Sequence, residues 1–512
     1  MQVSKSQPQI SIPEFYNGKS VFVTGGMGFI GKVLVEKLLR SCPGIENIYL
    51  LCRSKKGISI NERLEEITSS PAFDLLREQN PQALNKIILI EGDVAMLELG
   101  ISNEDQQILK DKVSIVMHSA ATISFTEPLK VAVNTNLRSM RELIALAKGI
   151  KNLEAFIHIS TAYTNWFKLD VKEEIYPNEL NPHDVIHFCE RFSDEIVNKA
   201  NSVLLGKHTT TYTFTKNLAE KLLQMETGNM PTCIIRPSIV TASVSEPKPG
   251  WIDSFGAASA FMFQIGAGMF RSIQHVKEHP FDWIPVDKVT NLTIAAAWRT
   301  ANDKKLNSNT KFPIVYHSTS GDVNPVTCKQ AFSVPAVLGK THPLKNVAWY
   351  PSMRFYSSSI GYDLDSYFFH YLPAYWMDIG AKLLGKKPRA LKAQQFMYNN
   401  YQDLRFATSV PYIFSAKNYK NLQNTMTQND QKTFNFDPVN INWKTYLDEY
   451  YLGMRKYLIK DTSDVNVMRK KVQKLKYTKY IMMTSLAAVT LLTAGAIGKR
   501  FVKKEDKESN IL

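Results

Sequence analysis

Tyr212 and Lys216 are the two residues whose types and spacing best suit chemistry on a carbonyl group. They open a run with helical periodicity, where a spacing of four residues places both side chains on one face. Hydride addition to a carbonyl leaves an oxyanion, which a phenol can hydrogen-bond and protonate. Because the pKa of a free tyrosine is about 10, the charge of a neighbouring lysine is expected to lower it toward neutral pH. The pair therefore predicts the catalytic residues of a reductase, and Lys216 could also hold the ribose of a nicotinamide cofactor.

Two hydroxyl groups precede this pair in the chain. Ser160 and Thr161 stand at the end of a predicted strand, where a hydroxyl can stabilise the same oxyanion by hydrogen bonding. We expect Thr161 to be that donor, with Ser160 as the alternative. Since a tyrosine and a lysine at this spacing occur often by chance, the prediction depends on whether a cofactor site accompanies them.

A glycine-rich loop near the N-terminus predicts such a site. The sequence TGGMGFIG joins a predicted strand to a predicted helix, and a second predicted strand follows. In such a unit Gly25 permits the tight turn, Gly28 admits the pyrophosphate of a dinucleotide, and Gly31 lets helix and strand pack closely. The N-terminus of the helix supplies N–H donors to phosphate. The residues expected to contact the cofactor here are Thr24, Gly25, Gly28, Phe29, Ile30 and Gly31.

The end of the second predicted strand favours NADPH as the cofactor. Proteins that prefer NADH place a carboxylate there, whereas this chain has Arg53, which suits a ribose 2′-phosphate. Lys55 and Lys56 follow and are also compatible with a solvated basic loop. The Asp93 carboxylate suits the adenine amino group, and small residues after a later strand leave room for the ribose. The further contacts expected from these positions are Asp93, Val94, Ala120 and Ala121.

Six short apolar segments are predicted to be buried strands, and helical or loop sequence separates each from the next. Strands that alternate with helices predict an α/β fold, a Rossmann-type doubly wound parallel sheet with right-handed crossovers. The predicted strands are residues 20–24, 48–52, 87–91, 114–118, 155–160 and 233–236, and the first predicted helix is 32–40.

The texture of the sequence changes at residue 343, where aromatic residues crowd together with helical periodicity. We read this part as a smaller, mainly helical C-terminal domain. The predicted organisation is an N-terminal arm at 1–15, a reductase domain with its substrate-binding part at 16–342, the helical domain at 343–460, a basic linker at 461–479, a transmembrane anchor at 480–498 and a tail at 499–512.

Two apolar stretches of the sequence could contact lipid. Residues 480–498 carry no charged side chain, and as a helix they would span roughly 28 Å, which matches a bilayer core. Basic residues bracket them, so we predict a single membrane-spanning helix rather than a buried core helix. Residues 255–270 are too short and too rich in glycine to span. They could line a lipid-shaped pocket, touch the membrane surface or form a buried helix.

Composition excludes several classes of protein. The net charge of +15 could suit nucleic acid, but no nucleic-acid-reading motif is present, and much of the charge lies near the C-terminus. The five scattered cysteines predict a reducing compartment and no disulfide framework. No metal site is predicted, because the histidine pairs are better read as surface or core residues. These pairs are His183 with His187, and His275 with His279.

The motifs together resemble the alcohol-forming fatty acyl-CoA reductases, a family of the extended short-chain dehydrogenase/reductase superfamily with a C-terminal sterile-type domain. The resemblance extends over nearly the whole chain. Its segments are VFVTGGMGFIGKVLVEKLL, IYLLCRSKKG, HSAATISF, HISTAYTN, YTFTKNLAE, IIRPSIV, EPKPGWID and WIPVDKVTNLTIAAAW, followed in the C-terminal domain by LPAYWMD, LGKKP, FNFD and NWKTYLDEYYLGMRKYL.

The resemblance implies roles for particular residues. It places Asn136 in support of the active-site helix, with Ser139 standing where the family often has glycine. It also packs the segment from Arg236 through Pro237 and Ser238 near the nicotinamide. The implied catalytic residues are Thr161, Tyr212 and Lys216, and the implied NADPH contacts include Gly25, Gly28, Gly31 and Arg53.

The implied reaction is reduction of a long-chain fatty acyl-CoA to a primary alcohol in two hydride steps through an aldehyde. Coenzyme A is itself the leaving group, so a cysteine nucleophile is not required. The resemblance and the basic flanks of the anchor favour the peroxisomal membrane, then the endoplasmic reticulum, with the catalytic part facing the cytosol. The alternatives are a sterol dehydrogenase or a nucleotide-sugar epimerase of the same superfamily, or an NADPH-binding scaffold without catalysis.

Overall fold

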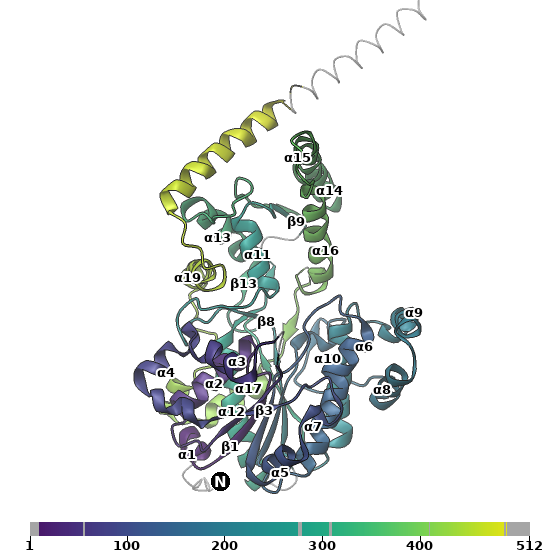
Figure 1. Ribbon diagram of the computed structural model, residues 1–512, viewed down its shortest axis with the longest axis vertical. Coiled ribbons are helices and arrows are strands. Elements are labelled where there is room, and N and C mark those ends of the chain that lie inside the picture. The colour runs from purple at the N-terminus through teal and green to yellow at the C-terminus, as the bar shows by residue number, and fades with distance from the viewer. Residues whose placement is uncertain are drawn as a thin grey trace, which may run out of the picture.

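A seven-stranded sheet forms the centre of the fold in the computed structural model, which describes residues 10–54, 57–274, 279–306, 310–408, 410–485 and 488 (Figure 1). Its strand order is β12-β7-β5-β4-β1-β2-β3, and all six neighbouring pairs are parallel. This confirms the predicted doubly wound α/β sheet. The strands are β1 (Ser20–Thr24), β2 (Ile48–Cys52), β3 (Ile87–Glu91), β4 (Val113–His118), β5 (Ala155–Ile159), β7 (Thr232–Pro237) and β12 (Ile314–Ser318).

Helices cover both faces of this sheet (Figure 1). Side chains of a strand alternate between the two faces. Accordingly Val21 and Val23 join one buried cluster with α2 (Phe29–Ser41) and α12 (Val286–Leu306), while Phe22 joins a second with helices of the opposite face. Because both faces are covered, β1 is buried along its whole length, which explains why its three central residues are all apolar. The helices of the opposite face include α5 (Asn103–Lys112), α7 (Ser139–Lys148) and α10 (Thr211–Glu226).

The chain after β12 returns to the sheet domain repeatedly. Helix α17 (Lys417–Thr425) packs against β12, and β15 (Ile413–Phe414) pairs with β6 (Asp170–Val171). Helix α19 (Trp443–Gly453) packs on α13 (Cys328–Thr341), and α13 in turn packs on α11 (Ala257–Gly266). Contacts therefore cross the predicted boundary between residues 342 and 343 at several places, and the division into domains stays a prediction.

The apolar stretch at 255–270 forms α11 and its flanks. Most of this stretch is buried among aromatic side chains of α13 and α19, so it forms a buried helix and not a surface helix. Its start also lines a cavity, through Gly256 and Ser259.

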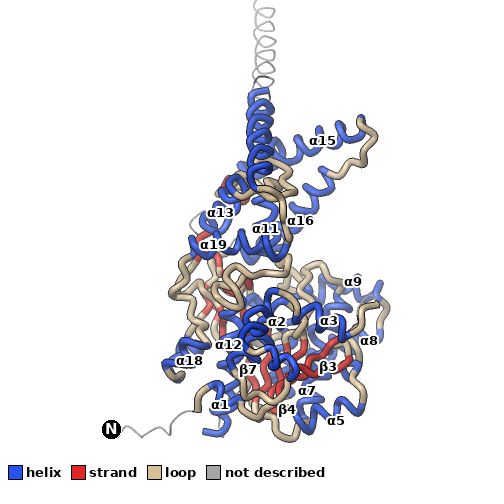
Figure 2. Tube along the Cα trace, turned by 60° about the vertical axis from the view of Figure 1, so that its left-hand side comes forward, coloured by secondary structure: helices blue, strands red, loops and turns tan. Residues whose placement is uncertain are grey.

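The C-terminal part of the chain continues into a helix described over residues 465–485, which runs away from the sheet (Figure 2). The membrane span predicted at 480–498 lies largely outside the described residues. Among the residues that the structure describes, no helix is long and apolar enough to cross a bilayer.

The remaining elements connect these layers. Small two-stranded sheets pair β10 (Pro280–Phe281) with β13 (Val326–Thr327), β11 (Trp283–Pro285) with β8 (Ile239–Thr241), and β14 (Arg354–Tyr356) with β9 (Ser272–Gln274). The other helices are α1 (Ile12–Tyr16), α3 (Ile60–Thr68), α4 (Asp74–Gln79), α6 (Leu129–Ala132), α8 (Pro182–Arg191), α9 (Asp194–Leu205), α14 (Ser359–Ser366), α15 (Leu372–Leu383), α16 (Ala390–Thr408) and α18 (Gln428–Thr433). The 3-10 and π segments are η1 (Pro71–Phe73), η2 (Pro81–Lys86), η3 (Leu97–Gly100), η4 (Val133–Arg138), η5 (Ala162–Asn165), η6 (Tyr367–Tyr371) and η7 (Met454–Leu458).

Candidate active site

A cavity of about 340 Å³ opens where β1, β4, β5 and β7 end at their carboxyl edges. Open parallel α/β sheets bind ligands at this edge. Eleven of the residues predicted from sequence line the cavity, and they come from segments far apart in the chain. They are Gly25, Gly28, Phe29, Ile30, Ala121, Ser160, Thr161, Tyr212, Lys216, Pro237 and Ser238.

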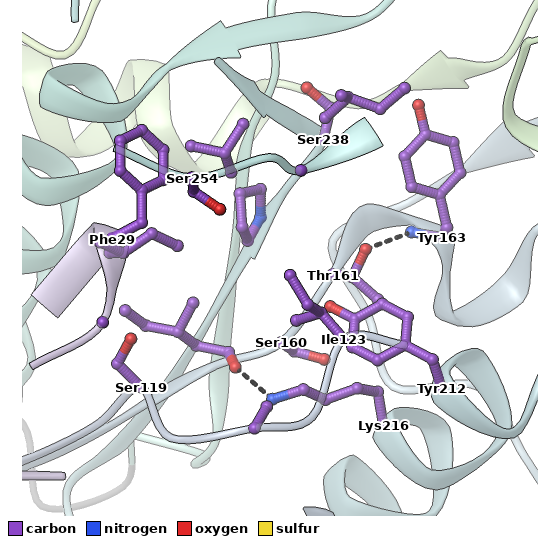
Figure 3. Close-up of a pocket in the computed structure, with 18 of the residues that line it drawn as sticks. Phe29, Ser119, Ile123, Ser160, Thr161, Tyr163, Tyr212, Lys216, Ser238 and Ser254 are labelled. Carbon is purple, nitrogen blue, oxygen red and sulfur yellow. Dashed lines mark hydrogen bonds between the residues drawn. The ribbon is translucent and has the colours of Figure 1, made fainter. Parts of the chain in front are cut away.

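The structure brings Tyr212, Lys216 and Thr161 together at one end of this cavity (Figure 3). Tyr212 and Lys216 lie on the first turns of α10, which Thr210 caps by accepting a hydrogen bond from the backbone N–H of Thr213 at 3.2 Å. The Thr161 hydroxyl follows β5 and is hydrogen-bonded to the Tyr212 phenol. One phenol, one ammonium and one hydroxyl therefore face the same space.

Burial sets the protonation of this group. It raises the pKa of Tyr212 to about 12, and the hydrogen bond from Thr161 offsets only part of that rise. Burial also lowers the pKa of Lys216 to about 7, opposed by the Glu220 carboxylate. The Lys216 ammonium donates to the carbonyl oxygen of Ile159 at 2.7 Å. The expected lowering of the Tyr212 pKa by Lys216 is thus wrong for this structure, because loss of solvent dominates and the opposing contribution comes from the Thr161 hydrogen bond.

Ser160 and Thr161 differ in what they can offer a substrate. Ser160 donates its hydroxyl proton to Glu220 at 2.5 Å, and Glu220 also accepts from Arg236 at 3.0 and 2.6 Å. The Ser160 proton is directed into this buried network, whereas the partner of the Thr161 hydroxyl is the Tyr212 phenol inside the cavity, so Thr161 is the better placed donor to an oxyanion. The preference for Thr161 over Ser160 stays a prediction, now with a structural reason.

Arg236 points away from the cavity that its neighbours line. It is fully buried, and besides Glu220 it donates to the carbonyl oxygens of Lys172 and Glu174 at 3.2 and 2.8 Å. Pro237 and Ser238 line the cavity, whereas the Arg236 side chain stabilises the layer behind it.

Asn136 contacts the helix that carries the catalytic pair. Its amide donates to the Thr215 hydroxyl at 3.0 Å and to the Thr122 carbonyl at 3.1 Å, and its oxygen accepts from the Thr122 backbone at 2.9 Å. Asn136 lies in the π-helical segment η4, and such segments often mark functional positions. The Ser139 hydroxyl donates to the Thr135 carbonyl at 2.6 Å, so serine is accommodated where η4 passes into α7.

The glycine loop has the geometry that a dinucleotide requires. Gly25 has φ +72°, and a Cβ there would lie 2.5 Å from the backbone nitrogen of Ala120. At Gly31 a Cβ would collide with the Gly25 carbonyl oxygen, so close packing of helix on strand needs glycine. A Cβ at Gly28 would have only one close neighbour, at 3.2 Å, and Gly28 lines the cavity. Thr24 tethers the loop through His118 at 2.6 Å.

The far end of the predicted cofactor site contains an ion pair between two predicted contacts. Arg53 donates to Asp93 at 2.6 Å, and the Arg53 side chain remains 61% exposed. Arg63 of α3 donates to the Arg53 carbonyl oxygen, which brings a second guanidinium to the same place. Arg63 was missed from sequence because it lies in a helix with no motif. Val94 packs against the core, and Lys55 and Lys56 lie outside the described residues.

The rest of the cavity lining is mostly apolar and was only partly anticipated. The phenyl ring of Phe125 packs edge-on against Tyr212, with ring centroids 5.9 Å apart. Residues within and just after the GWID segment also line the cavity. That motif was the sequence feature from which these lining residues could have been predicted. The lining residues not predicted as site residues are Ser119, Ile123, Phe125, Ile159, Tyr163, Thr213, Ile239, Val240, Ile252, Ser254, Gly256 and Ser259.

The cysteines are poorly placed for nucleophilic chemistry. All five are buried, and none lines the cavity. Burial raises the pKa of Cys189 to about 11 and that of Cys233 to about 12, which disfavours the reactive thiolate. Of the histidine pairs, His183 contacts Glu226 at 3.0 Å, and His275 lies outside the described residues.

The glycine loop and the comparisons with known proteins together place this chain among the oxidoreductases that bind a nicotinamide cofactor. Residues 23–293 and 369–461 match family models that are both described as male sterility protein. Fatty acyl-CoA reductase 1 of Homo sapiens is 37% identical over 478 residues, which cover 93% of this chain and 92% of that protein. Fatty acyl-CoA reductase 2 of Mus musculus is 36% identical over similar shares, 93% and 92%. The chain therefore belongs to the fatty acyl-CoA reductase family, which confirms the predicted resemblance.

Solved structures agree at the level of the fold. The terminal R domain from the myxalamid biosynthetic pathway matches with a TM-score of 0.56 at 16% identity, covering 86% of this chain and 90% of that one. The reductase domain of a non-ribosomal peptide synthetase from Mycobacterium tuberculosis matches with a TM-score of 0.53 at 17% identity, covering 87% and 93%.

Proposed function

We propose that the protein reduces a long-chain fatty acyl-CoA to the primary alcohol with NADPH, releasing coenzyme A. The observation that carries the proposal is the cavity itself, in which Thr161, Tyr212 and Lys216 face an apolar wall beside a glycine-rich dinucleotide loop. The relatives that share most of the chain are named fatty acyl-CoA reductases, which supplies the substrate class.

The residues at the loop fit a dinucleotide phosphate. Gly28 leaves room for a pyrophosphate, and the backbone N–H groups at the start of α2 can donate hydrogen bonds to it. At the adenosine end, Arg53 and Arg63 offer two guanidinium groups to a 2′-phosphate. A bound phosphate would take the place of Asp93 as the partner of Arg53, so we propose NADPH over NADH.

In the proposed reaction the bound cofactor supplies hydride to the carbonyl carbon. The remaining tasks fall to the chain. Thr161 and Tyr212 hydrogen-bond the carbonyl oxygen as negative charge develops on it, and Tyr212 donates a proton to it. The raised pKa of Tyr212 keeps the phenol protonated at neutral pH, which suits a proton donor. Lys216 holds the ribose and supplies positive charge beside the phenol.

One cavity can serve both reductions. The first produces a hemithioacetal, which loses coenzyme A and becomes the aldehyde, and the second reduces the aldehyde to the alcohol. Neither step needs a thiol of the protein, in keeping with the buried cysteines outside the cavity. The apolar wall formed by Ile239, Val240 and Ile252 suits the start of an acyl chain and excludes water from the reacting carbon.

The purified, detergent-solubilised protein tests this proposal with palmitoyl-CoA and NADPH. Consumption of NADPH is compared with the aldehyde and alcohol formed. Two NADPH per alcohol, without accumulation of aldehyde, is the expected result. One NADPH per released aldehyde would limit the activity to the first step, and no consumption would favour a sterol or nucleotide-sugar substrate, or a scaffold.

We further propose that residues 480–498 anchor the protein in a membrane, with the peroxisome favoured and the catalytic part facing the cytosol. The basic residues on both sides of this apolar sequence support the proposal. A chain ending at Asp464 should move to the soluble fraction of a cell lysate. Its retention with membranes would place a membrane contact elsewhere in the chain.

A further inference from the structure

A helical hairpin in the C-terminal part exposes large apolar side chains along α15 and at its tip, residues 382–392. Helices α15 and α16 pack against each other and are joined by residues 384–389. Trp376 is 62% exposed, Leu383 83% and Leu384 73%. Trp376 and Leu383 are seven residues apart and therefore lie on one face of α15. Several large apolar side chains exposed on one element suggest a site of interaction.

The same tip is strongly basic. Five basic residues fall between positions 382 and 392, all exposed, and no acidic residue occurs from 379 to 402. They are Lys382, Lys386, Lys387, Arg389 and Lys392.

The carboxylate closest to these charges in the sequence, Asp378, interacts with Lys382 and is also held by backbone N–H groups. Asp378 is only 8% exposed. It accepts the backbone N–H groups of Arg389, Ala390 and Leu391 at 2.8, 2.8 and 3.0 Å. Asp378 therefore fixes the start of α16, and the basic side chains of the tip point outward from a defined turn.

The hairpin lies at the end of the molecule toward which the C-terminal helix runs (Figures 1 and 2). Residues 465–485 of that helix contain six basic residues and no acidic residue. Its position is fixed, since Arg469 donates to the Thr341 carbonyl at 2.6 Å and the Lys479 ammonium lies 5.4 Å from the ring centre of Tyr350. The apolar sequence proposed as an anchor, residues 480–498, begins within the last turns of this helix.

We propose that the hairpin tip docks on the surface of an anionic phospholipid bilayer, as a second membrane contact besides the anchor. Tryptophan and tyrosine favour the headgroup region, aliphatic side chains enter the acyl boundary, and lysine and arginine pair with anionic headgroups. A second copy of this chain is a poorer partner, because two surfaces with these charges repel and the whole chain carries +15. Two contacts fix the orientation of the cavity relative to the membrane, which one span alone does not.

The buried cysteines make a site-specific test possible in the full-length chain. All five are shielded, so a maleimide dye reacts with an introduced Leu384→Cys and the unaltered chain serves as the labelling blank. Ile108→Cys is the matched control, because Ile108 is an exposed aliphatic residue on α5 at the opposite end of the molecule (Figures 1 and 2). Both proteins are reconstituted in vesicles of phosphatidylcholine and phosphatidylserine, with or without brominated acyl chains.

The dye at position 384 should shift to the blue and be quenched by brominated lipid, whereas the dye at 108 should do neither. Lys386→Gln with Lys387→Gln should lower the ratio of docked to undocked tip by roughly 25-fold, at about fivefold for each charge removed. Lys110→Gln with Lys112→Gln, on α5, should leave that ratio unchanged.

Three results would overturn the proposal. The first is a dye at 384 that stays in water while the protein sediments with the vesicles, which would leave the anchor as the sole contact. The second is a blue shift that depends on protein concentration without vesicles, which would assign the tip to a protein partner. The third is equal quenching in vesicles of pure phosphatidylcholine and in anionic vesicles.

Discussion

Replacing Glu220 by glutamine should destabilise the protein far more than the same change at a surface position. Glu220 and Arg236 form an ion pair in which the side chains are 1% and 0% exposed. Glutamine keeps the shape of the side chain but leaves the Arg236 charge without a counter-charge. Breaking a buried pair in this way costs about 3–5 kcal/mol. Two carbonyl contacts remain to Arg236, so we expect the lower part of this range.

Glu195→Gln is the matched control. Glu195 pairs with Lys199 one turn away on α9, and their side chains are 76% and 75% exposed. An exposed pair of this kind contributes roughly 0.3–0.5 kcal/mol. For a large domain, about 2 °C of melting temperature corresponds to each kcal/mol, so Glu220→Gln should lower the melting temperature by roughly 6–8 °C and Glu195→Gln by about 1 °C.

Thermal unfolding of the detergent-solubilised full chain, followed by tryptophan fluorescence, measures both variants side by side. Combining Glu220→Gln with Arg236→Met should cost less than the sum of the two single changes, because the stranded charge is then removed. The reasoning is refuted if Glu220→Gln has the same melting temperature as Glu195→Gln, or if the double variant is destabilised by the full sum of the two single changes.

Four further changes probe the site. Tyr212→Phe should lower kcat by about 10²- to 10⁴-fold while NADPH binding survives, and appreciable residual turnover would remove the phenol from the mechanism. Arg53→Asp should weaken NADPH relative to NADH by roughly 10- to 100-fold, and an unchanged preference in a KM comparison would place the phosphate elsewhere. The kcat/KM of the unaltered protein should fall as pH rises through about 7, where Lys216 loses its proton. Glu220→Gln should move that fall to lower pH, because Glu220 raises the pKa of Lys216. A pH profile without this fall would show that the charge of Lys216 is not needed. Gly31→Ala should destabilise the protein by about 1–3 kcal/mol through the collision with the Gly25 carbonyl, and an unchanged melting temperature would contradict the packing argument.

Local patterns predicted most of the sheet. The six strands expected from sequence are all present, with ends that differ by one residue at most. Five of them are almost wholly buried, and such strands are rich in apolar residues, whereas β3 at the edge of the sheet is partly exposed. The first helix begins at Phe29 and not at Lys32, since Gly28 itself caps it. The strand β12 was not predicted: its five residues follow a long helix and loop, and only its pairing with β7 gives them a place in the sheet.

The catalytic group was predicted from spacing, but its electrostatics were not. A spacing of four residues on a helix fixes that Tyr212 and Lys216 share a face, whatever the fold. The pKa of each depends on how much water the surrounding elements exclude. Burial raised the pKa of Tyr212, whereas the lysine charge alone predicted a lower pKa. Loss of solvent is a property of the assembled layers and leaves no local trace in the sequence.

The contacts between distant segments were likewise decided by the tertiary structure. The sequence by itself determined the glycine loop, the order of the strands along the chain, the tyrosine–lysine pair and the family, because each depends on residues close together or on a long set of motifs. Three sets of contacts exist only in the folded chain. Ser160 donates its proton to Glu220, which also pairs with Arg236, and Arg63 contacts Arg53. The segment after residue 410 packs against β6 and β12. These contacts join residues that the chain separates widely, and their free energy comes from shared burial, which exists only once the layers have packed.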